Sequence, residues 1–307
     1  MQVDFRILDA HVRKKENYIM PLKKYFLVFF LVLVACFAAS PAPPEAGQKA
    51  ASLEKKTGSC TFAILGDNRS GDDTYTKIIR LAMERRPDFM INVGDQISRP
   101  GSLSGWARFW ELSSQVNVPY FLTVGNHDAG NKKSEEIYRE QVDHPGNELY
   151  YSFPCGDSLF IILDSHMAGQ EKRITGGQFS WLEGLLETSA KKRKFVFLHH
   201  PLFSDRVLFA RNLDSHPGER DRLQQLLVKH RVTAVFAGHL HLYQRNTFDG
   251  ITNIITGGAG APLIADDENG GFFHFVLVTV KNGSVDGEVI DINGKVRDRF
   301  SLNGKGK

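Results

Sequence analysis

The chain has 307 residues, of which 42% are hydrophobic and 24% charged, and this composition is typical of a folded protein rather than a disordered or fibrous one. Its formal charge is +3, and since six basic and three acidic residues lie in the first 36 positions, the remainder carries no net charge. A neutral domain without a basic stripe is not the footprint of a duplex-binding protein, so we expect no nucleic-acid partner.

The N-terminal segment has the pattern of an export signal. Residues Tyr25–Ala39 are almost wholly apolar and follow Lys23 and Lys24. About 15 apolar residues are too few for a membrane span, which needs about 20, but they suit the core of a signal peptide. Because the first 19 residues are unusually charged for such a signal, Met20 is a better translation start than Met1, and we expect the chain to begin there.

Two cleavage outcomes remain open for this segment. Leu33-Val34-Ala35-Cys36 resembles a bacterial lipobox, which predicts a lipid on Cys36 and a tether to a membrane outside the cytoplasm. Ordinary secretion, with cleavage near Ala38-Ala39-Ser40, fits equally well, and an uncleaved anchor is a weaker third possibility. We therefore divide the chain into an export segment (1–39), a small, Pro-rich flexible linker (40–57) and a single domain (58–307).

Helical and extended patterns alternate through the domain. The expected helices are Asp73–Arg85, Ser104–Gln115, Ser134–Gln141, Gly177–Ser189 and Gly218–Lys229. The expected strands are Thr61–Leu65, Phe89–Val93, Tyr120–Val124, Phe160–Asp164, Phe195–Leu198 and Thr233–Ala237. This alternation predicts α/β order, and a domain of about 250 residues is long enough for a substantial core.

The C-terminal part changes character. Phe272–Val280, Ser284–Ile290 and Val296–Leu302 are expected strands, and Lys281-Asn282-Gly283 and Asn293-Gly294-Lys295 between them are good hairpin turns. Cys60 and Cys155 lack the clustered spacing of a zinc site. An exported setting permits a disulfide between them, but we expect two separate, partly buried thiols.

Five of the expected strands are followed by residues of the types that commonly act as metal ligands. The segments, in chain order, are Gly66-Asp67-Asn68-Arg69, Gly94-Asp95, Gly125-Asn126-His127-Asp128, His199-His200-Pro201 and Gly238-His239-Leu240-His241. Ligands of open α/β sheets bind at the carboxyl ends of the strands, so these side chains should converge on one rim. Mixed carboxylate, amide and imidazole donors suit Mn, Fe, Zn or Co better than Ca or Mg alone.

The order GD, GD, GNHD, HHP and GHLH resembles the signature of the calcineurin-like metallophosphoesterases over roughly residues 60–260. The run GHLHLYQR is most similar to the purple acid phosphatase branch. The resemblance implies a layered α/β fold, a four-layer αββα sandwich of two mixed sheets flanked by helices. It also implies a metal-dependent phosphoesterase, which the N-terminal segment predicts to be exported, in which a metal-bound hydroxide attacks a small phosphomonoester or phosphodiester.

The resemblance assigns a role to each motif residue. Asp67 and His241 would bind the first metal ion, Asp95 would bridge both ions, and the second ion would be held by Asn126, His199 and His239. His199 is chosen over its neighbour because the family pattern is His-x-Pro. His127 would be no ligand but a general acid or electrostatic stabiliser at the leaving-group oxygen, and with Asn126 it would contact substrate. The expected cofactors are two divalent or trivalent ions, most simply Mn, Fe or Zn.

The first motif departs from the family pattern. The family has Asp-x-His there, whereas this chain has Asp67-Asn68-Arg69, and an arginine cannot ligate a cation. Purple acid phosphatases place a Tyr three residues after the bridging Asp, but this chain has Ser98, so no iron–tyrosinate centre is expected. Occupancy of the first metal site is therefore open. Arg69 has two possible roles: it binds the substrate phosphate, or it pairs with a rim carboxylate and partly replaces the missing cation.

The alternative function is a non-catalytic or weakly catalytic relative that binds metal or phosphate through a degenerate first site. A metal-free hydrolase is disfavoured because the chain has no Gly-x-Ser-x-Gly elbow. The segments Trp106–Trp110, Asn131–Tyr138 and Phe203–His216 are expected to set specificity. We expect the partner to be a small phosphorylated substrate, and the protein to be a monomer or small homo-oligomer.

Three further features keep two interpretations each. His166, at a strand end, is more simply a rim histidine without a role than a pocket residue. The run Gly257–Pro262 either cradles phosphate or forms a turn beneath the site. Tyr243, Gln244 and Arg245 either line the pocket or support the ligands.

Overall fold

In the computed structural model the described residues are 46–146, 148–204 and 212–302. The predicted export segment with its lipobox-like run, and residues 205–211 of the expected specificity loop, lie outside them. Chain contacts divide the molecule into two units, Met1–Ser40 and Pro41–Lys307, and all described residues belong to the second. No helix within the described residues is long and apolar enough to cross a membrane.

The described residues form two six-stranded sheets. The first, sheet A, has the order β12-β11-β10-β1-β2-β3, and the second, sheet B, has the order β4-β5-β6-β7-β9-β8. Both are mixed, because β1-β2-β3 and β5-β6-β7-β9 are parallel while their flanking strands are antiparallel. The strands are β1 (Cys60–Leu65), β2 (Phe89–Asn92), β3 (Tyr120–Leu122), β4 (Tyr151–Cys155), β5 (Ser158–Ile162), β6 (Arg193–Leu198), β7 (Ala234–Ala237), β8 (Tyr243–Phe248), β9 (Ile251–Thr256), β10 (His274–Lys281), β11 (Ser284–Asp291) and β12 (Val296–Ser301).

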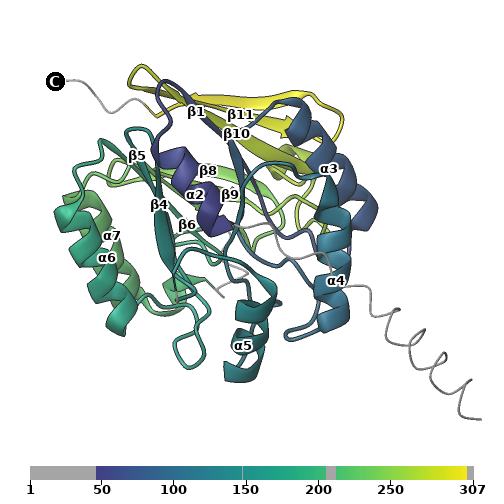
Figure 1. Cartoon of the computed structure of the whole chain (residues 1–307), viewed down its shortest axis with the longest axis horizontal. Coiled ribbons are helices and arrows are strands. Elements are labelled where there is room, and N and C mark those ends of the chain that lie inside the picture. The colour runs from purple at the N-terminus through teal and green to yellow at the C-terminus, as the bar shows by residue number, and fades with distance from the viewer. Residues whose placement is uncertain (1–45, 147, 205–211, 303–307) are drawn as a thin grey trace, which may run out of the picture. The chain divides into compact units, whose positions relative to one another are not determined.

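Helices cover the outer faces of the two sheets (Figure 1). Helices α3 and α4 pack on sheet A through side chains such as Ile79 and Trp106, while α6 and α7 pack on sheet B through Leu182 and Leu227. The predicted four-layer αββα architecture is therefore confirmed. The helices are α2 (Ala46–Glu54), α3 (Asp72–Glu84), α4 (Leu103–Leu112), α5 (Lys132–Gln141), α6 (Gly176–Thr188) and α7 (Pro217–Lys229), with short 3₁₀ turns η1 (Ser113–Gln115), η3 (Leu213–Ser215) and η4 (Asp267–Asn269).

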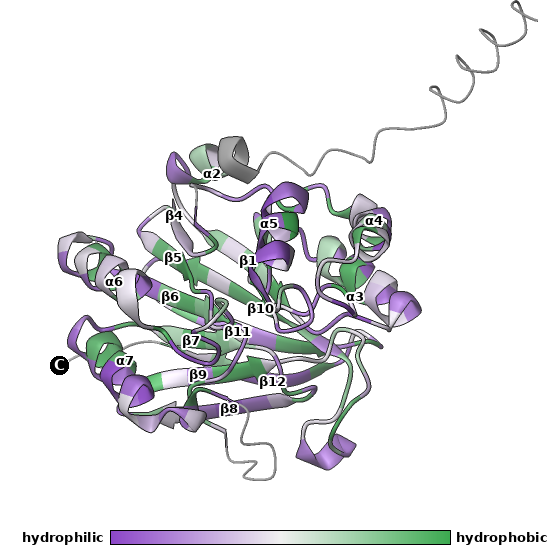
Figure 2. Ribbon diagram, turned by 90° about the horizontal axis from the view of Figure 1, so that it is seen from below, coloured by the Kyte–Doolittle hydropathy of each residue, from purple (hydrophilic) through white to green (hydrophobic). Residues whose placement is uncertain are grey.

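An aromatic core fills the space between the sheets. Phe62, Phe89, Phe160 and Phe195 are fully buried, and the ring of Phe62 lies 4.9 Å from that of Phe160 across the two layers. Central strands such as β6 and β7 are mostly green in Figure 2, since strands covered on both faces must be largely apolar on both. Strand β8, at the edge of sheet B, is largely hydrophilic instead.

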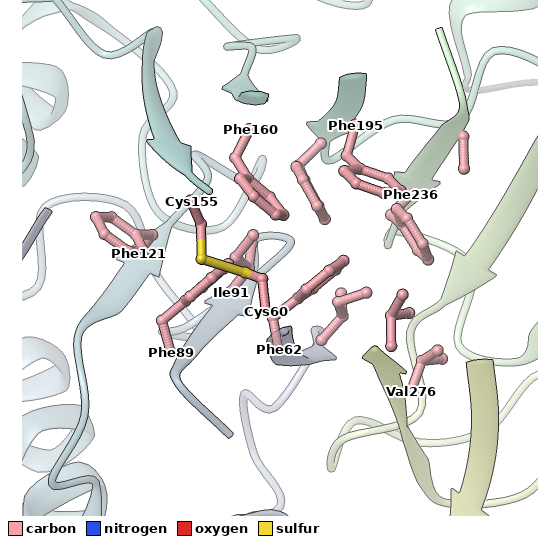
Figure 3. Close-up of a cluster of buried hydrophobic side chains, with 14 of the residues drawn as sticks. Cys60, Phe62, Phe89, Ile91, Phe121, Cys155, Phe160, Phe195, Phe236 and Val276 are labelled. Carbon is pink, nitrogen blue, oxygen red and sulfur yellow. A yellow bond between two sulfur atoms is a disulfide. The ribbon is translucent and has the colours of Figure 1, made fainter. Parts of the chain in front are cut away.

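A disulfide joins the two sheets within this core (Figure 3). It links Cys60, at the start of β1, to Cys155, at the end of β4, with the Cα atoms 6.4 Å apart. The expectation of two separate thiols is therefore wrong. The sequence separation of 95 residues gave no sign of this pairing, because proximity arises only when sheet A and sheet B face each other.

The predicted flexible linker is partly helical. Residues 46–54 form α2, and Ala50 and Leu53 are 8% and 5% exposed in the core between the sheets. These two side chains bury apolar surface that a solvated linker would leave exposed. The described part of residues 40–57 thus packs against the core of the folded unit.

The C-terminal hairpin forms as predicted. Lys281 pairs with Ser284 across the turn, and Asn282 and Gly283 have φ values of 52° and 82°. Two consecutive left-handed residues are the geometry of the type I′ turn that Asn-Gly favours.

Candidate metal centre

The ligand-type residues lie where neighbouring strands of both sheets end. In sheet A, β1, β2 and β3 are adjacent and parallel, so the loops after them carry Asp67, Asp95 and Asn126 to one edge. In sheet B, β6 and β7 are paired with Leu198 opposite Ala237, which places His199 beside His239. Contacts between the two sets, described below, confirm that the five strand ends converge.

The backbone at these positions is bent sharply. The backbone angle φ is positive at Asp67, Asp95 and His239, with values of 58°, 59° and 69°. Residues other than glycine seldom adopt such values. Glycine is required beside them: a Cβ on Gly94 would lie 2.4 Å from the His199 ring nitrogen Nδ1, and one on Gly238 would lie 2.5 Å from Asp67 Oδ2. Unfavourable backbone geometry concentrated at three neighbouring positions is typical of a functional site.

One part of the cluster is built around His199. Its Nδ1 lies 2.8 Å from the Val93 carbonyl, which can only accept, so Nδ1 carries the proton and Nε2 presents a lone pair. Nε2 lies 3.1 Å from Asn126 Oδ1 and 3.3 Å from Asp95 Oδ1. Three atoms with lone pairs that face one another at these distances can serve together as ligands of one metal ion. This is the set expected for the second metal ion.

His239 completes this part of the cluster. Its ring centroid lies 5.1 Å from that of His199. Burial, followed by the neighbouring His199, lowers the pKa of His239 to about 3, so the imidazole is neutral at physiological pH and can act as a ligand. His200 points elsewhere, because its Nδ1 lies 3.0 Å from the hydroxyl of Ser165. Its ring nevertheless lies 4.4 Å from that of His239, and His199, His200 and His239 form a second possible ligand group.

The other part of the cluster pairs Asp67 with His241. Asp67 is fully buried; its Oδ2 accepts a hydrogen bond from the His239 backbone N–H, whereas Oδ1 has no hydrogen-bond partner among the described residues. His241 Nδ1 is 2.7 Å from the Pro262 carbonyl, and this directs Nε2 toward Asp67 Oδ1 at 3.5 Å. Burial lowers the pKa of His241, but the facing Asp67 carboxylate and the Pro262 carbonyl outweigh it and raise the pKa overall. A buried carboxylate oxygen without a partner fits a cation-binding position.

Arg69 contacts the expected bridging ligand. Its Nε donates to Asp95 Oδ2 at 3.1 Å, and its side chain is only 19% exposed. This geometry is the ion pair with a rim carboxylate that the sequence offered as one of two roles. Burial raises the pKa of Asp95, yet the neighbouring His199 and His127 rings, the His127 backbone hydrogen bond and Arg69 lower it overall, so this carboxylate is ionised.

His127 stands at the solvent side of the cluster. Its backbone N–H donates to Asp95 Oδ1 at 2.9 Å, and its ring Nδ1 lies 3.0 Å from the Ser98 carbonyl. The ring is 33% exposed, with Nε2 4.0 Å from Asp95 Oδ2. Nδ1 therefore donates to Ser98, and Nε2 is accessible for proton exchange.

Asp128 is a site residue to which the sequence analysis assigned no role. It is fully buried and accepts hydrogen bonds, all between 2.8 and 3.1 Å, from the backbone N–H groups of Asp95, Gln96, Ile97 and Gly125. These bonds tie the loop after β2 to the loop after β3. The only signal in the sequence was its place at the end of the Gly-Asn-His-Asp run, where a ligand and a positioning residue look alike.

The structure shows the contacts of three features for which the sequence left two interpretations open. The glycine run holds the turn of the first motif, because Ala259 N and Ala261 N donate to the carbonyls of Gly66 and Asp67. Tyr243 and Arg245 both donate to Asp298, on β12. His166 stacks on His200 at a centroid distance of 5.3 Å.

The chain was compared with known proteins. A family model described as calcineurin-like phosphoesterase matches residues 60–243. The serine/threonine-protein phosphatase CPPED1 of Homo sapiens is 26% identical over 241 residues, covering 70% of this chain and 75% of the relative. Purple acid phosphatase 23 of Arabidopsis thaliana is 29% identical over 224 residues, covering 60% of this chain and 47% of the relative.

Solved structures show the same fold. Purple acid phosphatase PPD1 from yellow lupin (Lupinus luteus) superimposes with a TM-score of 0.68 at 18% identity, covering 80% of this chain and 54% of that chain. GAP50 of Plasmodium, described as the anchor in the inner membrane complex, superimposes with a TM-score of 0.64 at 16% identity, covering 82% and 90%. At these identities the likeness is one of fold.

Proposed function

The chain belongs to the calcineurin-like phosphoesterase family and is a metal-dependent phosphoester hydrolase, and from this premise we propose that the cluster around Asp95 hydrolyses a small phosphomonoester or phosphodiester. One observation carries the proposal. Lone-pair donors from the two sheets meet there: Asp95 Oδ1 and Asn126 Oδ1, which follow strands of sheet A, both lie within 3.3 Å of His199 Nε2, which follows a strand of sheet B.

The relatives of the chain imply a dinuclear metal centre, and the donor set fits one. Asn126, His199 and His239 would hold one ion, Asp67 and His241 the other, and Asp95 would contact both. Mn, Fe or Zn suits these mixed donors. When bound, such ions neutralise phosphoryl charge and lower the pKa of a coordinated water, so that a nucleophile is available near neutral pH.

His127 would supply the proton that the leaving group needs. With Nδ1 donating to the Ser98 carbonyl, protonation places the second proton on Nε2, the accessible nitrogen. A proton delivered to the departing oxygen contributes about 10²–10⁴-fold in rate.

Arg69 and Asn126 would orient the phosphoryl group. Arg69 is held at Nε by Asp95, which leaves its terminal guanidinium nitrogens, at the partly exposed rim, to donate to a phosphoryl oxygen. The ion pair with Asp95 and a contact to substrate are therefore compatible, because they use different nitrogens of one planar group.

Export of the chain is supported by the disulfide. Cys60–Cys155 links the two sheets, and such bonds persist mainly outside the reducing cytoplasm. We propose a periplasmic or cell-envelope location, with a lipid on Cys36 as the tether and plain secretion as the alternative. The substrate is a small molecule, with no nucleic acid, and the protein acts as a monomer or small homo-oligomer.

The second candidate function is binding of metal or phosphate without efficient hydrolysis. The Arg69–Asp95 ion pair favours it specifically, since it places a permanent cation where the family has a ligand.

The test combines metal analysis with turnover. The purified full chain is assayed on an aryl phosphomonoester and an aryl phosphodiester before and after addition of Mn²⁺, and its metal content is measured. We expect metal-dependent hydrolysis of at least one ester. Absence of turnover under every metal addition would favour the binding function.

Substitution of ligands provides a sharper form of this test. Asp95→Ala and His239→Ala should each lower turnover by at least ~10³-fold, because each removes a group on which metal-assisted charge stabilisation depends. Arg299→Ala, at an exposed position of edge strand β12, is the matched control and should keep full activity. Retained activity in both site variants, purified free of metal, would contradict the mechanism.

A further inference from the structure

The two halves of the cluster are unequally built. The half around His199 offers four protein donors, from Asp95, Asn126, His199 and His239. The half around Asp67 offers Asp67 Oδ1, His241 Nε2 and a share of Asp95. The position from which a further donor would come, two residues after Asp67, is occupied by Arg69.

Arg69 is fixed rather than mobile at this position. Its backbone N–H donates to the Asp95 carbonyl at 3.2 Å while its Nε donates to Asp95 Oδ2 at 3.1 Å, so side chain and main chain are both bound to the same residue. A guanidinium has no lone pair to give and stays charged at every accessible pH. It repels a metal cation beside Asp67, and it engages one of the two oxygens with which Asp95 attracts cations.

The Asp67 half is weakened but not abolished. Asp67 Oδ1 is buried without a hydrogen-bond partner among the described residues, and His241 Nε2 is directed toward it by the Pro262 carbonyl. A second ion therefore retains two donors there, and a phosphoryl oxygen of the substrate would add another.

We propose that Arg69 makes the two metal positions unequal: the chain binds one ion tightly through Asp95, Asn126, His199 and His239, and a second ion weakly through Asp67 and His241. This inference rests on the proposed metal centre. It adds that the resting protein holds a single ion at low metal concentration and that the second ion enters with, or is retained by, a phosphorylated ligand.

The experiment reads metal binding directly. The full chain, stripped of metal by chelation, is titrated with Mn²⁺, and free and bound ions are counted by electron paramagnetic resonance, in which a spin-coupled pair is distinguishable from an isolated ion. We expect one tight ion and a second at least ~100-fold weaker, in line with the effect that loss of a coordinating or supporting group has on metal affinity. Inorganic phosphate should tighten the second ion only.

Three variants separate charge from ligation. Arg69→His supplies an imidazole and should tighten the second ion by at least ~10-fold, with the spin-coupled signal at lower Mn²⁺. Arg69→Gln removes only the charge and should tighten it less. Arg299→His makes the same exchange at an exposed, carboxylate-paired arginine on edge strand β12, which β11 and β10 separate from β1, and should change neither affinity.

Either of two results overturns the inference: two ions bound by the wild type with affinities within a factor of about three, or a second affinity unchanged by Arg69→His. If Arg69→His fails to fold, Arg69→Gln decides, since an unchanged second affinity in that variant overturns the inference as well. One tight and one weak ion without any ester hydrolysis would support the inference and overturn the proposed function instead.

Discussion

His127 has the geometry of a proton donor rather than of a ligand. Its ring is a third exposed and is held at Nδ1 by Ser98, while its backbone N–H supports Asp95. The side chain can therefore be removed without removing a metal donor, because the support for Asp95 comes from the main chain. Acid catalysis and metal binding should be separable at this residue.

His127→Ala should lower turnover by about 10²–10⁴-fold for an ester with a poor leaving group and much less for an activated aryl ester, because only the former needs protonation. Metal content should equal that of the wild type. The measurement is a leaving-group series with metal analysis on the same samples. An equal loss across the series would assign His127 a structural role.

His274 gives the fold a dependence on pH. It is fully buried between the Thr256 hydroxyl and the Phe272 carbonyl, and burial lowers its pKa to about 4, against 6.5 for a free histidine. The unfolded chain thus takes up a proton between pH 6.5 and pH 4 that the folded chain does not. The contribution of His274 to stability is present above pH 6.5 and is lost as the pH falls through this window.

The size of this effect is about 3 kcal/mol at pH 4, from a shift of roughly 2.5 pKa units at 1.36 kcal/mol each. His274→Gln should destabilise the protein at pH 7 but lessen the loss between pH 6.5 and pH 4. Denaturant unfolding of both proteins at four pH values measures the difference. Parallel stability curves would show that His274 does not titrate as its burial predicts.

Among the secondary-structure elements, helix α2 differs most clearly from what the sequence predicts. The composition of residues 40–57, small, charged and Pro-rich, is that of a linker, yet the spacing of Ala50 and Leu53 places both on the face that meets the core. Three-residue spacing within a nine-residue helix is too brief a pattern to outweigh composition. Burial against another element decided the outcome.

Leu53→Ala should therefore destabilise the folded unit by about 2 kcal/mol, the lower end of the range for a buried leucine. Val228→Ala, at a 38% exposed position on α7, truncates a similar side chain outside the core and should cost about 0.5 kcal/mol or less. Chemical denaturation of the two variants measures both. If both variants lost little stability, and to the same extent, α2 would contribute no more to the folded unit than a solvated linker does.

Long amphipathic elements were predictable from the sequence, whereas edge and contact-dependent features were not. Helix α6 was expected at Gly177–Ser189 and spans Gly176–Thr188, since its apolar spacing is sustained over three turns. Strand β8 was missed because Tyr243–Phe248 is polar and pairs only at the sheet edge. In the site, ligand-type residues at strand ends were visible, but the partner of Arg69 and the loop-clamping contacts of Asp128 depend on distances that sequence does not encode.

At the scale of the whole molecule, the disulfide constrains how the sheets meet. It closes a loop with a sequence separation of 95 residues, for which loss of chain entropy in the unfolded state amounts to about 4 kcal/mol. The double variant Cys60→Ala, Cys155→Ala should lose stability on this order. Reductant should destabilise the wild type and leave the variant unaffected, as followed by urea unfolding. A wild type indifferent to reductant under unfolding conditions would contradict this.

Strand β1 carries Cys60 at its first residue and leads into Asp67 two residues after its last. One short strand of sheet A is thus fastened to sheet B covalently at one end, and an ion held by Asp67 and His241, as proposed above, would link it to sheet B at the other. In that arrangement the metal would be a structural component as well as a catalytic one. Ions bound at the site would hold the two sheets in place relative to each other. Activity and the stability of the contact between the sheets would therefore increase together as the metal concentration rises.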